Sequence, residues 1–201
     1  MILYSDRDDH YSQRVRIVLA EKDITAEIKE AKPEETPEDI LSISPYHKLP
    51  ILVDRDLAIH DPSVMMEYLD ERFPHPPLFP VYPVARAQSR LWIYRIKQDW
   101  CDKVDFLMAG KGTPTQLDKA RKELRESIIS IAPIFGEKPF FMSDEFTIVD
   151  CCVTPILWRL PYMGIDLPKN KAVKPLLEYR DRLFERESIL ASFSEQEKEM
   201  V

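Results

Sequence analysis

The feature that most constrains this 201-residue chain is a run of prolines near its middle. Five prolines fall within the ten residues from 74 to 83. Because proline fixes φ and lacks a backbone N–H, this stretch cannot form an α-helix or a central β-strand. It predicts a stiff, exposed connector between two differently built parts of the chain. We therefore expect domains at residues 1–72 and 85–201, joined by a Pro-rich segment at residues 73–84.

The Pro-rich segment also has the properties of a recognition surface. A rigid loop that presents His75, Phe79 and Tyr82 loses little conformational entropy when a partner docks. Its role as a linker and its role in recognition are compatible, and the residues alone leave both open.

Upstream of this segment, short apolar runs alternate with short amphipathic stretches. Strands are predicted at residues 1–4, 25–30, 51–54 and 57–60, and helices at residues 11–22, 37–42 and 62–72. The order β-α-β-α-β-β-α places a parallel strand pair and an antiparallel hairpin in one sheet. This is the layout of a thioredoxin-like domain. The apolar face of its last helix is predicted to bury Val64, Met65, Tyr68 and Leu69.

Downstream of the Pro-rich segment, nearly all of the chain has a helical period. Helices are predicted at residues 84–109, 115–135, 147–160 and 174–186, with shorter pieces after them. Pro133 is expected to fray the second of these helices and Pro155 to distort the third. The chain therefore predicts an α/β domain followed by an all-α domain.

A capping box marks the start of the third of these helices. The Thr147 hydroxyl is placed to accept from the backbone N–H of Asp150, and the Asp150 carboxylate to accept from that of Thr147. We interpret this pair as a folding device and not as catalytic residues.

Charge is unevenly placed along the chain. Residues 1–72 hold 9 Lys and Arg against 17 Asp and Glu, a balance of −8, whereas the whole chain carries −7. An acidic first domain disfavours direct binding of nucleic acid or of an anionic membrane, and favours a basic protein partner.

Other bulk features predict a cytoplasmic protein that holds no metal. No apolar run approaches the ~20 residues of a membrane span, and no signal peptide is recognisable. The three cysteines, Cys101, Cys151 and Cys152, have no zinc-ligand spacing and are expected to be small core residues. The four histidines have no metal-ligand spacing either, and no Gly-rich phosphate loop is present.

The two-part architecture with this capping box resembles the cytosolic glutathione transferases over the whole chain. Narrower stretches resemble the stringent starvation protein A family, an RNA polymerase-associated branch of that superfamily. These stretches are residues 11–22, 66–77, 81–86 and 142–145. The resemblance implies a homodimer that binds RNA polymerase holoenzyme, in its sigma factor region, and alters promoter choice under stress. The residues implied to contact the polymerase are Pro74, His75, Pro76, Pro77 and Tyr82.

The same resemblance implies a glutathione site that has lost its chemistry. The position of the thiolate-activating hydroxyl or thiol falls on Asp9, and an ionised carboxylate repels a thiolate. Asp61 and Pro62 replace the Glu-Ser pair that holds the γ-glutamyl carboxylate, so a hydroxyl and a backbone N–H are both missing. Leu49 and Pro50 match the cis-proline position of such domains. No cofactor is therefore expected.

Two other readings remain open at this point. Tyr4, Ser5, Tyr11 and Ser12 offer hydroxyl groups near the site, so a weak glutathione-dependent transferase or peroxidase is the main alternative. A purely structural dimer is what remains if the Pro-rich segment binds nothing.

Overall fold

A computed structural model describes residues 1–200 of the chain. These residues form two compact units, one of residues 1–77 with 187–199 and one of residues 78–186 with 200. The domain boundaries expected at residues 72 and 84 stay a prediction. Across the described residues, no helix combines the length and the apolar character that crossing a bilayer requires.

The first unit is built on a four-stranded mixed sheet. Its strands are β1 (Ile2–Ser5), β2 (Glu27–Glu30), β3 (Ile51–Asp54) and β4 (Leu57–Ile59), in the order β2-β1-β3-β4. β1 and β2 are parallel, with Ile2 opposite Glu27, whereas β1–β3 and β3–β4 are antiparallel. The predicted thioredoxin-like layout is confirmed, and the strand ends differ from the prediction by one or two residues.

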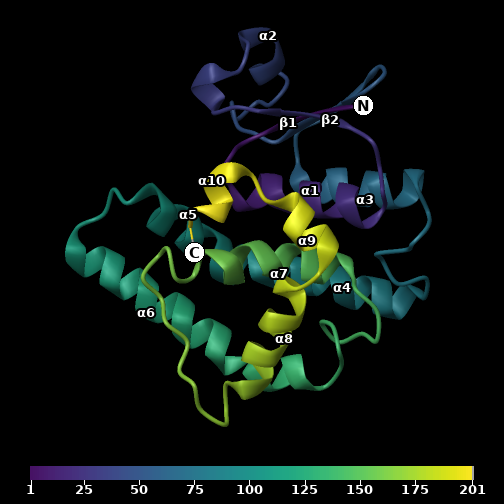
Figure 1. The fold of residues 1–201 in the computed structure, drawn as a ribbon. Helices are drawn as coiled ribbons and strands as arrows, with labels where there is room; N and C mark the ends of the chain where they lie inside the picture. The colour runs from purple at the N-terminus through teal and green to yellow at the C-terminus, as the bar shows by residue number, and fades with distance from the viewer. Residues whose placement is uncertain (201) are drawn as a thin grey trace. The chain divides into compact units, whose positions relative to one another are not determined.

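Helices pack on both faces of this sheet. α1 (His10–Glu21) and α3 (Pro62–Arg72) lie on one face, and the short α2 (Glu38–Leu41) lies on the other side, after a 3₁₀ turn at Pro33–Glu35 (Figure 1). Alternate residues of β1 and β3 and the inner faces of α1 and α3 form the core: Leu3, Val15, Val18, Leu52, Met65 and Leu69.

The predicted apolar face of α3 is partly wrong. Val64 is 53% exposed, and Met66 is buried in addition to Met65 and Leu69. Tyr68 is half-buried, and its hydroxyl donates to Asp54 at 2.7 Å. The core face of α3 is therefore formed by Met65, Met66 and Leu69, and Val64 lies outside it.

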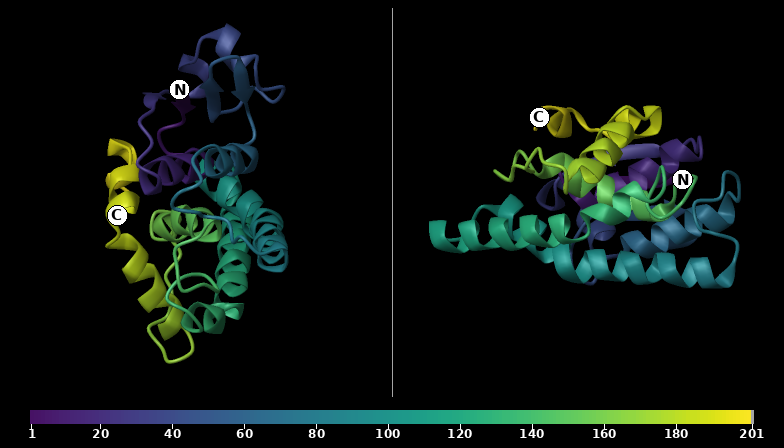
Figure 2. Two further views of the ribbon diagram at one scale, coloured as in Figure 1. Left: turned by 90° about the vertical axis from the view of Figure 1, so that its right-hand side faces the viewer. Right: turned by 90° about the horizontal axis from the view of Figure 1, so that it is seen from below.

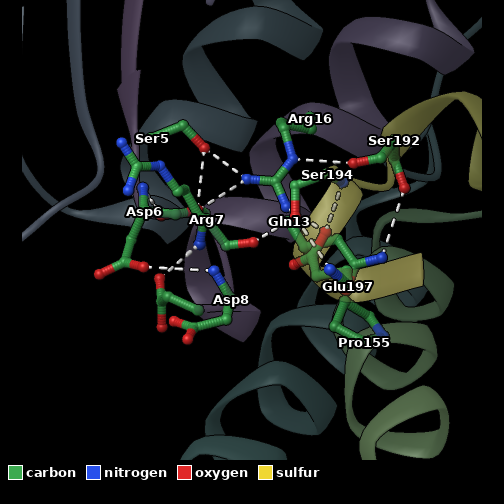
Figure 3. Close-up of polar contacts among 12 residues, drawn as sticks. Ser5, Asp6, Arg7, Asp8, Gln13, Arg16, Pro155, Ser192, Ser194 and Glu197 are labelled. Carbon is green, nitrogen blue, oxygen red and sulfur yellow. Dashed lines mark hydrogen bonds and ion pairs between the residues drawn. The ribbon is translucent and has the colours of Figure 1, made fainter. Parts of the chain in front are cut away.

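The C-terminal segment belongs to the first unit. α9 (Glu187–Ser192) packs along α1, and α10 (Glu195–Lys198) follows it, both in yellow in Figure 1. The Arg16 guanidinium donates to the carbonyl of Ser192 at 2.8 Å and forms a buried ion pair with Glu197 at 2.5 Å (Figure 3). The Ser194 hydroxyl also donates to the carbonyl of Arg7. The sequence predicted only short pieces here.

The second unit is helical, as predicted. Its helices are α4 (Pro83–Ile96), α5 (Asp102–Ala109), α6 (Pro114–Ser130), α7 (Ile148–Arg159) and α8 (Lys174–Phe184). A π-helical turn at Lys97–Cys101 interrupts the single helix predicted at residues 84–109 and divides it into α4 and α5, which belong to the teal helices in Figure 2. α6 ends at Ser130 and a 3₁₀ turn at Ala132–Gly136 follows, because Pro133 cannot continue the helical hydrogen bonds.

α7 is the central helix of the second unit. Nearly every residue of it is buried, including Cys151 and Cys152, and it continues through Pro155 as one helix. Cys101 is buried as well, so all three cysteines are core residues of this unit.

Candidate functional site

The start of α1 is capped by the chain's own carboxylate. Asp9 is the N-cap residue, and its Oδ2 accepts from the backbone N–H of Ser12 at 2.7 Å. The resemblance implies a thiolate-activating group at this position, which therefore carries a negative charge instead. That carboxylate already accepts a hydrogen bond from a backbone N–H group in the first turn of α1. An incoming thiolate would meet repulsion here and would find one of the helix's N–H groups occupied.

Two further carboxylates lie close to this end of α1. The Lys32 ammonium is 2.9 Å from Asp6 Oδ1 and also contacts Asp8, and Arg7 pairs with Glu35 at 2.8 Å. Burial is the largest influence on Asp6 and raises its pKa from 3.8 to about 6. The hydrogen bond from Lys32 opposes this rise, and the Asp8 carboxyl adds to it. The Asp6 and Asp8 carboxylates stabilise the positive charge of the Lys32 side chain. The same carboxylates disfavour an anionic ligand at this end of α1.

The raised pKa of Asp6 predicts a pH dependence of stability. The folded protein holds the Asp6 proton more tightly than the unfolded chain, so this group stabilises the fold below pH 3.8, and the contribution is lost as pH rises to about 6. We expect Asp6→Asn to lack this loss and to gain stability relative to the original protein over that interval. Urea unfolding of both proteins across the interval measures it, and parallel pH curves would contradict the assignment.

The start of α3 repeats the pattern seen at α1. Asp61 Oδ1 accepts from the backbone N–H groups of Ser63 at 2.9 Å and Val64 at 3.1 Å, and Pro62 has no N–H. A ligand carboxylate at this helix start would meet the Asp61 carboxylate instead of open donors. The Leu49–Pro50 bond is cis, as the resemblance implies, and both residues are buried. The first-turn N–H groups of α1 and α3 that have acceptors here are therefore bonded to the chain's own carboxylates.

The Pro-rich segment divides into exposed and buried parts. In the first unit, the side chains of Pro74, His75, Pro76 and Pro77 are exposed, and the His75–Pro76 bond is cis. In the second unit, Tyr82 is 78% exposed and Val81 is 77% exposed. A protein partner can reach these side chains without unfolding either unit.

Phe79 does not belong to this exposed surface. It is 4% exposed, and the guanidinium groups of Arg86 and Arg90 lie 5.1 Å and 5.5 Å from its ring centroid. The expectation that Phe79 contributes to recognition is wrong, because its ring is buried in the core of the second unit. The preceding Leu78 is buried too, and its carbonyl accepts from the N–H of Ile148 at 3.0 Å.

Sequence reasoning missed Lys22. This residue caps the C-terminal end of α1, and its buried ammonium contacts Asp70 and the backbone beneath the exposed prolines. Its spacing could have predicted its burial. Val15, Val18 and Lys22 follow one helix face, so the lysine lies where an apolar residue is expected. A buried lysine requires a partner, which the sequence did not identify.

The capping box forms at the start of α7 and is more extensive than predicted. The Asp150 carboxylate accepts from the N–H of Thr147 at 2.7 Å and from its hydroxyl at 2.9 Å. It also accepts from the Phe141 N–H at 2.9 Å and the Tyr179 hydroxyl at 2.6 Å. Burial raises the pKa of Asp150, and these four donors oppose that rise. The cluster connects α7, α8 and the preceding loop, which is a structural role.

Metal binding has no support in the described part of the chain. Residues 1–200 contain no group of three or more His, Cys, Asp or Glu side chains arranged to hold an ion.

Comparison with known proteins identifies similar sequences over both units. The family model described as "Glutathione S-transferase, N-terminal domain" matches residues 3–77, and that described as "Glutathione S-transferase, C-terminal domain" matches residues 114–182. The chain is 48% identical over 200 residues to a stringent starvation protein A homolog from Coxiella burnetii, covering 100% of this chain and 94% of that protein. A homolog of the same description from Pasteurella multocida is 49% identical over 192 residues, covering 96% and 89%.

Solved structures agree on the fold. A bacterial glutathione transferase, BphK, in a ternary complex, superposes with a TM-score of 0.86 over 98% of this chain and 100% of its own. Its sequence is 19% identical, so this likeness extends to the fold alone.

Proposed function

Because the chain belongs to the stringent starvation protein A family of the glutathione S-transferase superfamily, we propose that it is an RNA polymerase-associated transcription regulator. It acts by protein–protein contact with the holoenzyme, in the sigma factor region, under stationary-phase or stress conditions. RNA polymerase is cytoplasmic in bacteria, so the proposal places the protein there. The observation that carries it is the exposure of Pro74, His75, Pro76 and Pro77 as one continuous stretch.

The exposed stretch suits protein recognition. Prolines hold a backbone near one conformation, so little conformational entropy is lost when a partner docks on Pro74, Pro76 and Pro77. The His75 ring supplies a flat surface with a donor and an acceptor. Tyr82 adds an exposed aromatic side chain, a residue type that is enriched at interface hot spots. The acidic balance of residues 1–72 favours a basic partner surface and not nucleic acid.

The proposal includes the absence of transferase activity. Asp9 and Asp61 occupy the starts of α1 and α3 with their own carboxylates. Glutathione is anionic at its carboxylates and at its reactive thiolate, so both helix starts disfavour it.

Restoring one of these groups is not expected to restore activity. Pro62→Ser returns a hydroxyl and an N–H to the start of α3, but Asp9 still faces the position of the thiolate. We expect no turnover of a generic electrophile with glutathione and no retention on immobilised glutathione. Pro62→Ser combined with Asp9→Ser is the matched comparison. Robust turnover by the single variant would show that Asp9 does not prevent binding of the thiolate.

We also propose that the protein is a homodimer, formed by the first unit of one subunit and the first two long helical stretches of the other, α4–α5 and α6. Three exposed apolar residues, Val84, Leu91 and Tyr94, follow one face of α4 and are 72%, 63% and 60% exposed. In the first unit, Val64 on α3 is 53% exposed. Exposed apolar faces of this kind mark interaction surfaces.

Sedimentation tests the dimer. The original protein is expected to sediment as a dimer at micromolar concentration, and Leu91→Arg as a monomer, because a buried guanidinium without a partner disfavours association. Leu190→Arg, which changes a 49% exposed leucine of α9, should leave the dimer intact. A monomeric original protein would refute the proposal.

A further inference from the structure

The exposed loop in the first unit has few means of holding its own shape. We define the Pro-His-Pro loop as residues 73–77. Among residues 74–77 only His75 has a backbone N–H, because the other three are prolines. A backbone without N–H groups cannot form the hydrogen bonds that order helices, strands or turns. The carbonyl groups of the loop therefore need donors from elsewhere in the fold.

The Lys22 ammonium supplies such donors from the end of α1. Its Nζ lies 2.7 Å from the carbonyl oxygen of Phe73 and 2.7 Å from that of Pro76. A third contact, also of 2.7 Å, joins it to Asp70 Oδ1 on α3. An ammonium has three N–H groups, so each of them has an acceptor at hydrogen-bond distance.

These contacts are buried, although the loop side chains are not. The Lys22 side chain is 0% exposed and that of Asp70 is 7% exposed, whereas Pro74, His75, Pro76 and Pro77 are all exposed. The loop thus turns two of its carbonyls toward the protein interior and its side chains toward solvent. Charge-assisted hydrogen bonds shielded from water are stronger than neutral exposed ones.

We propose that Lys22 is a positioning residue for partner binding. By holding the carbonyls of Phe73 and Pro76, it fixes the direction in which Pro74 and His75 project. Asp70 compensates the buried charge and keeps the ammonium in place. A loop held in this way loses less conformational freedom on docking. The inference rests on the proposed function only where it concerns the polymerase, since the ordering of the loop can be measured without a partner.

The decisive variant is Lys22→Met with Asp70→Leu. It removes both charges together, so no charge is left buried without its partner, and it keeps apolar volume beneath the loop. The two carbonyls then lose their donors. Asp70→Asn is the first comparison, because it removes the ion pair but keeps the Lys22 amine next to the carbonyls. If the double variant does not fold, Lys22→Gln, whose shorter side chain cannot reach all three acceptors, replaces it.

Arg16→Met with Glu197→Leu is the matched control. These two side chains form another buried ion pair of the first unit, 2.5 Å long and 3% and 0% exposed. The Arg16 hydrogen bonds go to Ser5, Asp6 and Ser192 in addition to Glu197, and none goes to residues 73–77. This control therefore perturbs the same unit without touching the loop.

The first readout is the order of the loop, from hydrogen exchange of the Phe73 amide, which donates to the Leu69 carbonyl at 3.0 Å, and from the carbon–proton NMR signal of the His75 ring. We expect exchange to rise about tenfold or more in Lys22→Met/Asp70→Leu, since the carbonyls that order the loop are released. The His75 signal should move toward that of an unstructured peptide, while His10, His47 and His60 keep theirs. Neither change is expected in the control. Asp70→Asn is expected to show smaller changes than the double variant, because its Lys22 amine still reaches both carbonyls but has lost the carboxylate that holds it in place. Unchanged exchange and an unmoved His75 signal would overturn the inference.

The second readout is capture of RNA polymerase holoenzyme. We expect roughly tenfold weaker capture by Lys22→Met/Asp70→Leu, which corresponds to about 1.4 kcal/mol, and capture within about twofold for the Arg16→Met/Glu197→Leu control. A disordered loop with full capture would overturn the positioning role, provided that the triple alanine variant of Pro74, His75 and Pro76 loses capture. If that triple variant captures normally, the proposed function itself fails. The ordering of the loop by Lys22 is then tested by hydrogen exchange and the NMR signal alone.

Discussion

Replacement of Pro74, His75 and Pro76 by alanine is expected to abolish capture of RNA polymerase holoenzyme while the fold and the dimer persist. These side chains are exposed, so their removal costs little stability. Binding suffers for two reasons. Without the prolines, more conformational freedom is lost on docking. Without the His75 ring, the interface loses a donor, an acceptor and a flat contact surface, and a few residues usually carry most of the binding energy.

Capture of purified holoenzyme by immobilised protein measures this effect, with circular dichroism and sedimentation as checks on fold and dimer. Pro114→Ala is a suitable control, because Pro114 is an exposed proline at the first position of α6 and is expected to leave capture unchanged. Tyr82→Ala should weaken capture to a smaller extent. Equal recovery of polymerase by the original and triple alanine proteins, both folded and dimeric, would leave the Pro-rich segment as a linker only.

Loss of the Asp150 carboxylate is expected to destabilise the second unit strongly. Asp150→Ala removes the acceptor for the N–H groups of Phe141 and Thr147 and for the Tyr179 hydroxyl, all in the interior. A buried donor without an acceptor costs about 1–3 kcal/mol. We expect a total loss of ~3–5 kcal/mol, with the helix cap included.

Chemical denaturation followed by far-UV circular dichroism measures this loss. Asp144→Ala is the control: that carboxylate is exposed and pairs with Lys138 at 2.8 Å, so its removal should change stability by less than about 1 kcal/mol. Tyr179→Phe removes one of the donors to Asp150 and should cost less than Asp150→Ala. A change below about 1 kcal/mol for Asp150→Ala would show that the cluster does not stabilise this unit.

Much of the architecture was predictable because it depends on local properties of the chain. The hairpin, the Asp61 cap and the Thr147–Asp150 box each involve residues a few positions apart, and backbone sterics or one local hydrogen bond decide them. The βαβ order follows from the apolar period of each segment and from the right-handed crossover that joins parallel strands. The five prolines of the Pro-rich segment likewise exclude a helix or a central strand without reference to the rest of the fold.

The tertiary structure decided what depends on packing between distant residues. Val64 was expected to be buried and is exposed, whereas Phe79 was expected to be exposed and is buried. Burial depends on which neighbours surround a side chain and not on its own polarity. Asp150 gained Tyr179 as a donor from 29 positions away, and Lys22 gained carbonyls 51 and 54 positions away. The sequence shows that Lys22 follows an apolar helix face, but only the fold brings it beneath residues 73–77. A buried charge needs a partner, and the fold can supply that partner from a distant part of the sequence. No local sequence pattern predicts which part it will be.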